Sequence, residues 1–259
     1  MEKRNGSMTD WNAQQYKKFE RERTQPSIDL IHRIDGKPNS ILDIGCGPGN
    51  STYQLKKYFP KAHLLGIDQS QDMLAKAKMT YPDLSFQEAN IPNDLGSLDS
   101  YDLIFSNACL HWIPDHSTLL PKLINQLNDH GVLAVQMPMV QTAIFYRCLN
   151  EVLTREKWNR LRNIHNFHNL SPNETFDILM PISNVTMWET TYYHVLENHD
   201  AIIEWYKGSG LRPYLNLLSE TKKEEFISDV MRILQKEIPM QKNGSVLLKM
   251  PRLFFIARK

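Results

Sequence analysis

A glycine-rich segment could bind a ligand through its backbone. In Ile41-Leu-Asp-Ile-Gly-Cys-Gly-Pro-Gly49, three alternate glycines stand between a short apolar run and a stretch with helical spacing. Without side chains, Gly45, Gly47 and Gly49 let the backbone approach a ligand closely at the start of a helix. Asp43 lies near the end of the apolar run, where its carboxylate would repel a phosphate and attract an ammonium or a sulfonium. The segment therefore favours a ligand that carries positive charge.

Two other interpretations of this segment stay open. The glycines could form an ordinary tight turn, or they could bind the pyrophosphate of a dinucleotide. The dinucleotide fingerprint has the spacing GxGxxG, whereas this chain has GxGxG with Asn50 in the sixth place. The spacing, taken with Asp43, favours an adenosyl sulfonium over a nicotinamide dinucleotide.

Two polar residues follow the next two apolar runs. Asp68 ends the run 63–67, at a distance from the glycines where an acidic side chain can accept hydrogen bonds from both ribose hydroxyls. This spacing is common to nicotinamide and adenosyl binders, so it predicts a ribose and no particular reaction. Asn90 follows the run 84–87 and could hydrogen-bond an adenine, although by itself it is better explained as a turn residue.

Alternating apolar runs and helical patterns predict the elements that position these residues. Such alternation predicts an α/β fold with a doubly wound, Rossmann-like, mainly parallel sheet. We expect strands at 40–44, 63–67, 84–87, 101–106 and 132–136, and helices at 27–34, 50–59, 70–77 and 119–127.

The alternation stops after Pro138. A long helical pattern covers 142–164 and a polar segment follows at 171–173, before strands at 185–195 and 252–257 that bring the sheet to seven strands. The helical patterns at 200–206 and 224–235 predict a helical cap inserted between these last two strands. We expect a single domain, 1–259, with an N-terminal arm at 1–26, a cofactor-binding core at 27–138, a cap and substrate-binding elaboration at 139–250, and a final strand at 251–259.

Composition narrows the class of protein. With 259 residues, 41% of them hydrophobic, the chain can bury one sizeable core. A formal net charge of +1 gives no basic field for nucleic acid or for an anionic membrane surface. No apolar run is long enough for a membrane helix, and the polar residues 1–10 do not resemble a signal peptide. We therefore expect a cytoplasmic protein whose partner is a small molecule; its oligomeric state is left open.

The cysteines and histidines do not predict a metal site. Cys46, Cys109 and Cys148 are odd in number and include no CxxC pair, which argues against a disulfide framework and a thiolate zinc site. His165 and His168 have helix-face spacing, but no third ligand is near them in the sequence, and the HEXXH pattern is absent. We expect reduced thiols and no metal.

Together with the segment Tyr101-Asp-Leu-Ile-Phe-Ser-Asn107, these motifs resemble the Rossmann-like methyltransferase superfamily. The resemblance implies that the cofactor is S-adenosyl-L-methionine and that the glycine loop lies under its methionine part. It also implies that Asp68 binds the ribose and that Asn90, where the superfamily often has aspartate, meets the adenine. Asp43 and Asn107 complete the implied cofactor-binding set.

Segments spread over nearly the whole chain are similar to the trans-aconitate 2-methyltransferase family. Three of them lie outside the cofactor motifs, where a shared cofactor fold would not by itself produce a match. The resemblance implies a carboxyl O-methyltransferase that esterifies a small polycarboxylic acid, first of all trans-aconitate. The segments are Trp11-Asn12, 47–52, 107–116, 131–138, 188–194, 210–215 and 252–258.

The implied reaction suits a carboxylate. A carboxyl group with an ordinary pKa near 4 is already ionised at neutral pH, so that no general base is required. Catalysis then depends on orientation in a site shielded from water. His111 and Trp112 could fix the reacting carboxylate through their N–H groups, although a buried aromatic pair at a helix start would look the same. His111 departs from the glutamine that the family pattern leads us to expect.

A polycarboxylate brings further negative charges that need partners. Arg212 is the first candidate, since a guanidinium binds a carboxylate bidentately and its segment is one of the matching ones. We also expect hydrogen-bond donors at Tyr192, Tyr193 and His194. Tyr16 and Arg23 of the N-terminal arm could close over the substrate.

Three alternatives remain. The acceptor could be another small acid or a secondary metabolite. The chain could be a non-catalytic binding or scaffold protein with the same fold, although such a protein would not need the glycine loop and Asp68. A nicotinamide oxidoreductase is disfavoured by the glycine spacing.

Overall fold

The computed structural model describes residues 20–164 and 167–259. The chain divides into two compact units, which we describe separately. Unit 1 comprises Met1–Met137, Leu170–Trp188 and Phe254–Lys259; unit 2 comprises Pro138–Asn169 and Glu189–Leu253.

Unit 1 is built on a seven-stranded sheet in the order β3-β2-β1-β4-β5-β7-β6. The five strands from β3 to β5 are parallel, and the strand order reverses between β1 and β4. In open α/β sheets this reversal creates a crevice at the carboxyl ends of the strands. The predicted seven-stranded, mainly parallel sheet is confirmed. Its strands are β1 (Ser40–Ile44), β2 (His63–Asp68), β3 (Ser85–Glu88), β4 (Tyr101–Asn107), β5 (Leu127–Pro138), β6 (Asn184–Leu196) and β7 (Val246–Arg258).

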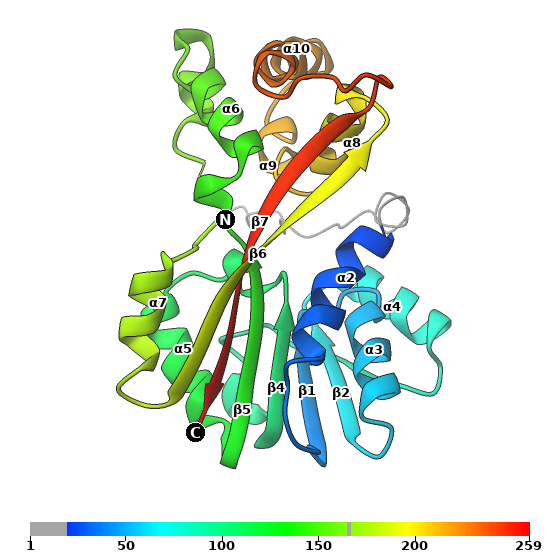
Figure 1. Cartoon of the computed structure of the whole chain (residues 1–259), viewed down its shortest axis with the longest axis vertical. Coiled ribbons are helices and arrows are strands. Elements are labelled where there is room, and N and C mark those ends of the chain that lie inside the picture. Colours follow the sequence, from blue (N-terminus) through cyan, green and yellow to red (C-terminus); the bar gives the residue numbers. More distant parts are fainter. Residues whose placement is uncertain (1–19, 165–166) are drawn as a thin grey trace, which may run out of the picture. The chain divides into compact units, whose positions relative to one another are not determined.

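The helices of unit 1 form two groups beside the sheet (Figure 1). In one group, α3 contacts α2 and β2, and α4 contacts β2 and β3; in the other, α5 packs with α7. The helices are α2 (Glu20–Ile31), α3 (Asn50–Tyr58), α4 (Gln71–Thr80), α5 (His116–Asn125) and α7 (Pro172–Leu179), with short 3₁₀ helices η1 (Leu95–Ser97) and η2 (Leu110–Trp112).

Local chemistry explains where α4 begins and which face it buries. The Ser70 hydroxyl accepts a hydrogen bond from the Met73 amide and so caps the helix, as the sequence predicts. Met73, Leu74 and Ala77 lie on one face and are buried. The same periodicity that predicted the helix therefore attaches it to unit 1.

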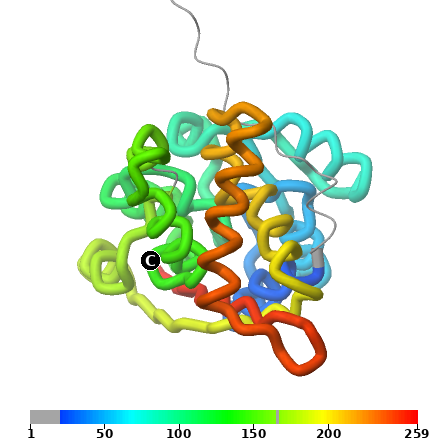
Figure 2. Tube along the Cα trace, turned by 90° about the horizontal axis from the view of Figure 1, so that it is seen from above, coloured from blue at the N-terminus to red at the C-terminus, as the bar shows by residue number. Residues whose placement is uncertain are grey.

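Unit 2 is mainly helical. Its longest helix, α10 (Glu220–Glu237), contacts α6 (Ile144–Leu153) and α8 (His199–Lys207), which flank it in Figure 2. The remaining elements are α9 (Arg212–Leu215) and the 3₁₀ helices η3 (Val140–Thr142) and η4 (Glu156–Leu161). Three helices, α8, α9 and α10, lie between β6 and β7 in the chain, where the sequence predicts an insertion.

The long helical pattern at 142–164 forms two helical elements, α6 and η4, rather than one. The chain leaves helical geometry at Arg155, whose φ and ψ are −70° and 138°, and continues as the 3₁₀ helix η4. A buried carboxylate, that of Asp229 on α10, accepts a hydrogen bond from Trp158 Nε1 at 2.8 Å and pairs with Arg155 at 2.7 Å. This tertiary contact favours the break, which periodicity could not reveal.

The polar segment at 171–173, for which no helix was predicted, begins α7. Ser171 and Glu174 form a capping box, in which each side chain hydrogen-bonds the backbone N–H of the other residue. Pro172 occupies the first turn, where its missing N–H costs nothing.

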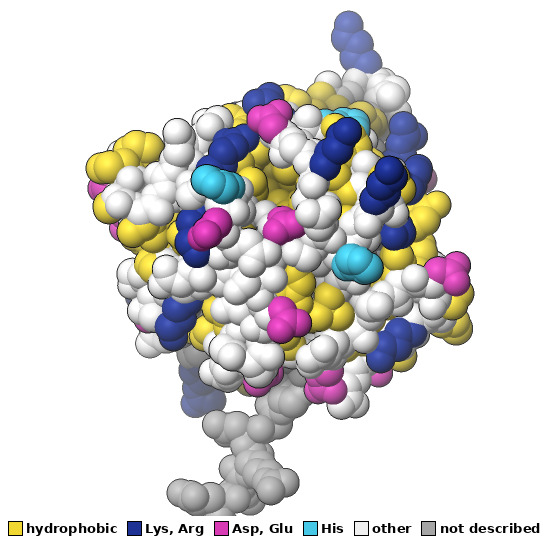
Figure 3. Space-filling model, turned by 90° about the horizontal axis from the view of Figure 1, so that it is seen from below, with side chains coloured by type: hydrophobic (Ala, Val, Ile, Leu, Met, Phe, Trp, Pro, Cys, Tyr) yellow, Lys and Arg dark blue, Asp and Glu magenta, His cyan; other side chains and the backbone are white. Residues whose placement is uncertain are grey.

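Basic and acidic side chains are interspersed on the face that Figure 3 shows. None of the helices in the described ranges, 20–164 and 167–259, is both long and apolar enough to span a membrane.

Candidate functional site

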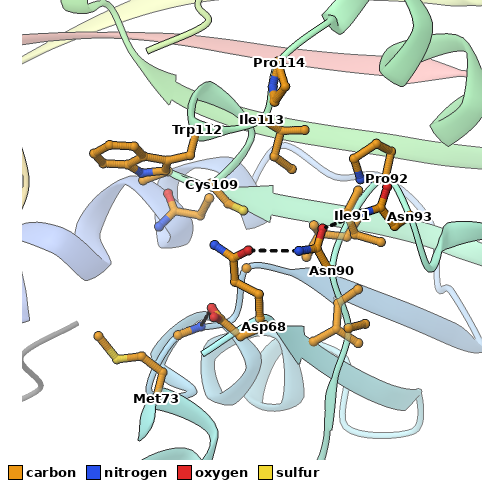
Figure 4. A pocket seen from close by; sticks show the side chains of 18 residues that line it. Asp68, Met73, Asn90, Ile91, Pro92, Asn93, Cys109, Trp112, Ile113 and Pro114 are labelled. Atoms are coloured by element: carbon orange, nitrogen blue, oxygen red, sulfur yellow. Dashed lines mark hydrogen bonds between the residues drawn. The ribbon is translucent and has the colours of Figure 1, made fainter. Parts of the chain in front are cut away.

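A cavity of about 460 Å³ lies in unit 1 at the carboxyl ends of β1, β2 and β4. This volume is within the range of small-molecule sites. Figure 4 shows Trp112, Cys109 and Ile113 on one side, Asp68 and Met73 on the opposite side, and the segment Asn90–Asn93 closing a third. Six of the predicted site residues line it: Gly45, Gly47, Asp68, Asn90, Asn107 and Trp112.

The three glycines of the loop after β1 serve different purposes. All have positive φ, at 71° for Gly45, 54° for Gly47 and 91° for Gly49. A Cβ on Gly45 would collide with the Cys109 side chain, and one on Gly49 would lie 2.8 Å from the Tyr81 ring. A Cβ on Gly47 would meet nothing within 4 Å in the described part of the chain. Gly47 therefore leaves open space in the cavity, whereas Gly45 and Gly49 allow close packing.

The N–H groups of this loop are already used inside the protein. Gly45 and Cys46 both donate to the Ile67 carbonyl, at 2.8 and 3.0 Å, and Gly49 donates to the Cys46 carbonyl at 3.0 Å. Gly47 donates to Asp68 Oδ2 at 3.0 Å. A pyrophosphate needs free N–H groups at such a loop. Their use here argues against the dinucleotide interpretation.

Asp43 places a buried negative charge at the start of α3. Its Oδ2 accepts hydrogen bonds from Ser51 and Thr52 of that helix, at 2.6 and 2.7 Å. Its Oδ1 is buried without a donor among the described residues. The carboxylate therefore occupies the helix N-terminus that a phosphate would use. Asp43 is not in the cavity wall and can act on a ligand only through its field.

Burial raises the pKa of Asp43 to about 6; the hydrogen bonds from Ser51 and Thr52 oppose this rise, and the nearby charge of Asp68 adds to it. A cation in the cavity would favour the ionised form and lower this pKa again. Ligand charge and Asp43 protonation are therefore coupled.

Asp68, at the end of β2, connects the glycine loop to α4. Its Oδ2 holds the Gly47 amide, and its Oδ1 accepts from the Ser70 amide at 2.9 Å. Burial raises the pKa of Asp68 above its ordinary value, although these backbone hydrogen bonds oppose the rise. Each carboxylate oxygen retains a lone pair that could accept a hydroxyl of a ligand.

Asn90 forms part of a polar turn after β3. Its amide group donates to Gln69 Oε1 at 3.4 Å, its side-chain oxygen accepts from Asn93 at 3.4 Å, and its backbone N–H donates to Asp94 at 2.7 Å (Figure 4). Asn90 is therefore both a turn residue and part of the cavity wall. Binding of an adenine remains a prediction.

Asn107, the last residue of β4, presents an acceptor. Its Oδ1 is buried and has no hydrogen-bond donor in the ranges that the structure describes. A buried acceptor without a donor costs about 1–3 kcal/mol. A ligand that donates a hydrogen bond there would remove this cost.

The loop after β4 positions Trp112. It turns at Ala108 and Asp115, whose φ values of 54° and 55° are left-handed. Leu110 lies between these turns, and its carbonyl accepts a hydrogen bond from His116 Nε2 of α5 at 2.8 Å, which anchors η2. Trp112 lines the cavity, whereas its neighbour His111 is buried and lies outside the lining, with its ring 4.9 Å from the Trp112 ring.

The other predicted substrate residues are distributed between the two units. Arg23 lies on α2 in unit 1, partly buried, and Tyr16 lies outside the described residues. Tyr192, Tyr193 and His194 lie on the part of β6 that belongs to unit 2. Their exposure alternates: His194 is 6% exposed and Tyr193 61%, so these two point to opposite faces of the strand. Arg212 begins α9 in unit 2 and is half-buried.

Sequence reasoning missed several residues of the cavity wall. Met73 was assigned to the buried face of α4, and Cys109 was treated only as a reduced thiol. Burial raises the pKa of Cys109 above its ordinary value, which makes this thiol a packing group rather than a nucleophile. The segment Ile91–Asn93 gave no signal beyond its turn chemistry. Within the described residues, no three His, Cys, Asp or Glu side chains are grouped to hold a metal.

Comparisons with known proteins show the family of the chain. Residues 36–200 match the model of the family described as "Methyltransferase domain". Trans-aconitate 2-methyltransferases of Escherichia coli O7:K1 (strain IAI39) and of Shigella flexneri are each 39% identical over 97% of this chain and 99% of theirs.

Solved structures support the fold. The YcgJ protein from Bacillus subtilis has a TM-score of 0.59 at 16% identity and covers 91% of this chain and 98% of its own. Phosphoethanolamine N-methyltransferase 2 of Haemonchus contortus, solved with S-adenosyl-L-methionine, has a TM-score of 0.55 at 16% identity, over 91% of this chain and 52% of its own. From the match over nearly the full length, the chain belongs to the trans-aconitate 2-methyltransferase family.

Proposed function

We propose that the cavity of unit 1 binds S-adenosyl-L-methionine and that the enzyme transfers its methyl group to a carboxylate of trans-aconitate. The observation that carries the proposal is the polarity of the cavity wall. Asp68 and Asn107 offer acceptor oxygens there, while the loop N–H groups that a phosphate would need are engaged. A ligand with ribose hydroxyls, an ammonium and a sulfonium matches acceptors and negative charge.

The residues present fit this cofactor. Gly47 leaves room beside the loop for the methionine part, and Asn107 Oδ1 could accept from its ammonium. Asp68 could accept the ribose hydroxyls. Ile91, Ile113 and Met73 provide apolar wall, and Asn90 offers hydrogen bonds to an adenine. Asp43, beneath the loop, favours positive charge in the cavity.

A carboxylate acceptor suits the groups around the cavity. When bound, the cofactor supplies an electrophilic methyl group, which a carboxylate oxygen takes as the sulfur–methyl bond breaks. No proton moves in this step, so the enzyme needs orientation and exclusion of water rather than a base. Trp112 is the aromatic group in the wall that could cover the reacting atoms, and its indole N–H could orient the carboxylate. His111, buried behind it, would act by holding Trp112.

The acceptor is proposed from the relatives. Proteins named trans-aconitate 2-methyltransferase match 97% of this chain at 39% identity, well beyond the residues of the cofactor motifs. The enzyme would act on a small carboxylate without a nucleic acid or a membrane partner, and we propose a cytoplasmic location.

The experiment is a methyl-transfer assay with trans-aconitate, cis-aconitate, citrate and isocitrate, with the product and the esterified position read by mass spectrometry. We expect a monomethyl ester, formed fastest from trans-aconitate. Binding of S-adenosylhomocysteine without turnover of any of the four acids would favour another acid or a secondary metabolite as acceptor. Absence of S-adenosylhomocysteine binding in calorimetry would instead favour a scaffold protein.

A further inference from the structure

Three side-chain amides are joined by hydrogen bonds along the wall of the cavity in unit 1. They belong to Gln69, Asn90 and Asn93, all of which line the cavity. Asn93 Nδ2 donates to Asn90 Oδ1 at 3.4 Å, and Asn90 Nδ2 donates to Gln69 Oε1 at 3.4 Å (Figure 4). The amides therefore all point in one direction, and we call these three residues the amide relay.

The sheet places two members of the relay side by side. β2 and β3 are parallel neighbours, with Asp68 opposite Glu88, and the Ala89 N–H donates to the Asp68 carbonyl at 3.1 Å. Gln69 and Asn90 follow directly after these paired residues. Both side chains thus leave the same edge of the sheet, where the cavity lies.

A closed turn brings the third member back to Asn90. The Asn90 N–H donates to Asp94 Oδ2 at 2.7 Å, and the Asp94 N–H donates to the Asn90 carbonyl at 2.9 Å. This pair of bonds fixes the backbone at both ends of the turn that carries Asn93. The order of the three amides is therefore set by the backbone.

The relay gives the Asn90 amide a direction. A primary amide has two N–H groups and two carbonyl lone pairs, and Asn90 uses one of each within the relay. The other N–H and the other lone pair can serve a ligand. Turning Asn90 alone would place two donors face to face at Asn93 and two acceptors face to face at Gln69. The oxygen of Asn90 therefore stays toward Asn93 unless all three amides turn together.

The surroundings of the relay suit the flat ring of a base. Ile91, Pro92 and Ile113 also line the cavity, and Figure 4 shows all three on the side where Asn93 lies. Apolar side chains can cover the faces of a ring, while amides bond the polar groups at its edge.

The direction of the relay distinguishes between bases. Gln69 directly follows Asp68, which is proposed to accept the ribose hydroxyls, so the ribose end of a nucleoside belongs at the Gln69 end of the relay. The amino group of adenine is on the far side of the base from the ribose, toward Asn93, where Asn90 presents its oxygen. Hypoxanthine has a carbonyl oxygen at the same place, which would meet that acceptor with a second one.

We propose that Gln69 and Asn93 are positioning residues, which fix the direction of the Asn90 amide and so make the cavity select adenine over hypoxanthine. This inference rests on the proposed function, because it takes the ligand to be an adenosyl cofactor. It assigns base selection to two side chains for which the sequence motifs give no role.

The test compares two ligands that differ only in the base. S-adenosylhomocysteine and S-inosylhomocysteine, which carries hypoxanthine, are each titrated calorimetrically into the wild type. We expect the inosyl compound to bind roughly 10- to 100-fold more weakly, because an acceptor then faces the Asn90 oxygen. The readout is the ratio of the two Kd values. A merely structural role of the relay would weaken both ligands equally and leave this ratio unchanged.

Two substitutions of an amide by a carboxylate, at opposite ends of the relay, have different expected results. Gln69→Glu keeps an acceptor toward Asn90 Nδ2, so the Kd ratio should stay within about threefold of the wild type. Asn93→Asp replaces a donor by an acceptor, so Asn90 and Gln69 should turn over and the ratio should fall by about tenfold or more. Each variant adds one negative charge, so Gln69→Glu is the matched control for charge.

A third variant removes the donor without adding a charge. In Asn93→Ala the Kd ratio should fall by less than in Asn93→Asp, since Gln69 still accepts from Asn90. Gln69 and Asn93 are exposed in the free enzyme, so thermal unfolding should be the same in all three variants as in the wild type. If Asn93→Asp binds neither ligand, Asn93→Ala carries the test.

The failure of the inference differs from the failure of the proposed function. Equal Kd values of the two ligands in the wild type would overturn the inference and leave cofactor binding intact. So would a ratio that neither Asn93 variant changes. Absence of S-adenosylhomocysteine binding by the wild type would overturn the proposed function, and the inference with it.

Discussion

Unit 1 and unit 2 differ in how their polar groups are brought together. In unit 1 the polar residues of the cavity follow successive strands, Gly45 after β1, Asp68 at the end of β2 and Asn107 at the end of β4. Each is placed by the strand before it, so its spacing in the sequence reveals its position. In unit 2 Asp229 on α10 pairs with Arg155, which precedes η4, and with Lys157 of η4, residues more than 70 positions away in the sequence. Parallel strands display their ligands in sequence order, whereas packed helices do not.

The largest expected effect comes from filling the space at Gly45. Gly45→Val would place a branched side chain against Cys109 on a backbone with φ of 71°. We expect loss of S-adenosylhomocysteine binding by more than about 100-fold, since both the loop and the cavity wall must shift. Calorimetry measures this, with Gly96→Ala as the control because nothing lies within 4 Å of its added Cβ in the described residues. Normal affinity in Gly45→Val would show that cofactor binding does not require the close contact between Gly45, after β1, and Cys109, after β4.

In unit 2 we expect the substitution Asp229→Asn to lower stability. This residue is 3% exposed, and its carboxylate pairs with Arg155, Lys157 and Arg232 and accepts a hydrogen bond from Trp158. Removing the charge leaves three cations with one partner fewer, so we expect a loss of about 2–4 kcal/mol in the free energy of unfolding. Denaturant unfolding measures the loss, and Arg232→Gln, which removes only the most exposed of the three partners, should cost less. Unchanged stability would show that the break between α6 and η4 does not depend on this carboxylate.

Protonation of Asp229 at low pH should destabilise the wild type, as the Asp229→Asn substitution does at neutral pH. Although burial raises the pKa of Asp229, the hydrogen bonds from Lys157 and Trp158 and the charges of Lys157 and Arg155 lower it overall. A lowered pKa contributes stability that is present above the unfolded value near 4 and is lost as the pH falls through the folded value. The difference in stability between wild type and Asp229→Asn should therefore shrink below about pH 4.

More of unit 1 than of unit 2 could be predicted from the sequence, because the polar residues of unit 1 follow single strands whereas those of unit 2 meet only through tertiary contacts. Asp68 and the glycines were found because their motif is contiguous and its spacing is set by one strand and one turn. The kink at Arg155 escaped because periodicity from 142 to 164 is helical on both sides of it, and only the Asp229 contact favours the break.

Asp68→Asn should weaken cofactor binding in unit 1 without affecting unit 2. The amide keeps the shape of the carboxylate but loses the charge and one acceptor for the ribose and for the Gly47 amide. We expect the Kd of S-adenosylhomocysteine to rise roughly 10- to 100-fold. The KM of trans-aconitate, measured with saturating cofactor, should stay within about twofold. A parallel rise of both constants would contradict separate roles for the two units.

Arg212→Ala is the reciprocal test in unit 2. We propose that this half-buried guanidinium contributes to acid binding, so the KM of trans-aconitate should rise about tenfold with little change in cofactor affinity. The effect should not be larger because a partly exposed charge is screened by solvent. Steady-state kinetics at saturating cofactor measure the KM. Unchanged kinetics would remove Arg212 from the proposed substrate site.

The smallest effect is a pH dependence specific to unit 1. Because Asp43 has a pKa of about 6 in the free enzyme, it is mostly ionised at pH 7 and mostly protonated at pH 5. A bound cation favours the carboxylate, so cofactor affinity should fall by up to about tenfold between pH 7 and pH 5. The stability of the free enzyme changes in the opposite direction, because a raised carboxyl pKa favours folding at low pH and this contribution is lost as the pH rises through 6. Calorimetry and thermal melts over this range measure the two trends. Asp43→Asn should flatten both, and a pH-independent affinity in the wild type would mean that Asp43 supports the loop only through Ser51 and Thr52.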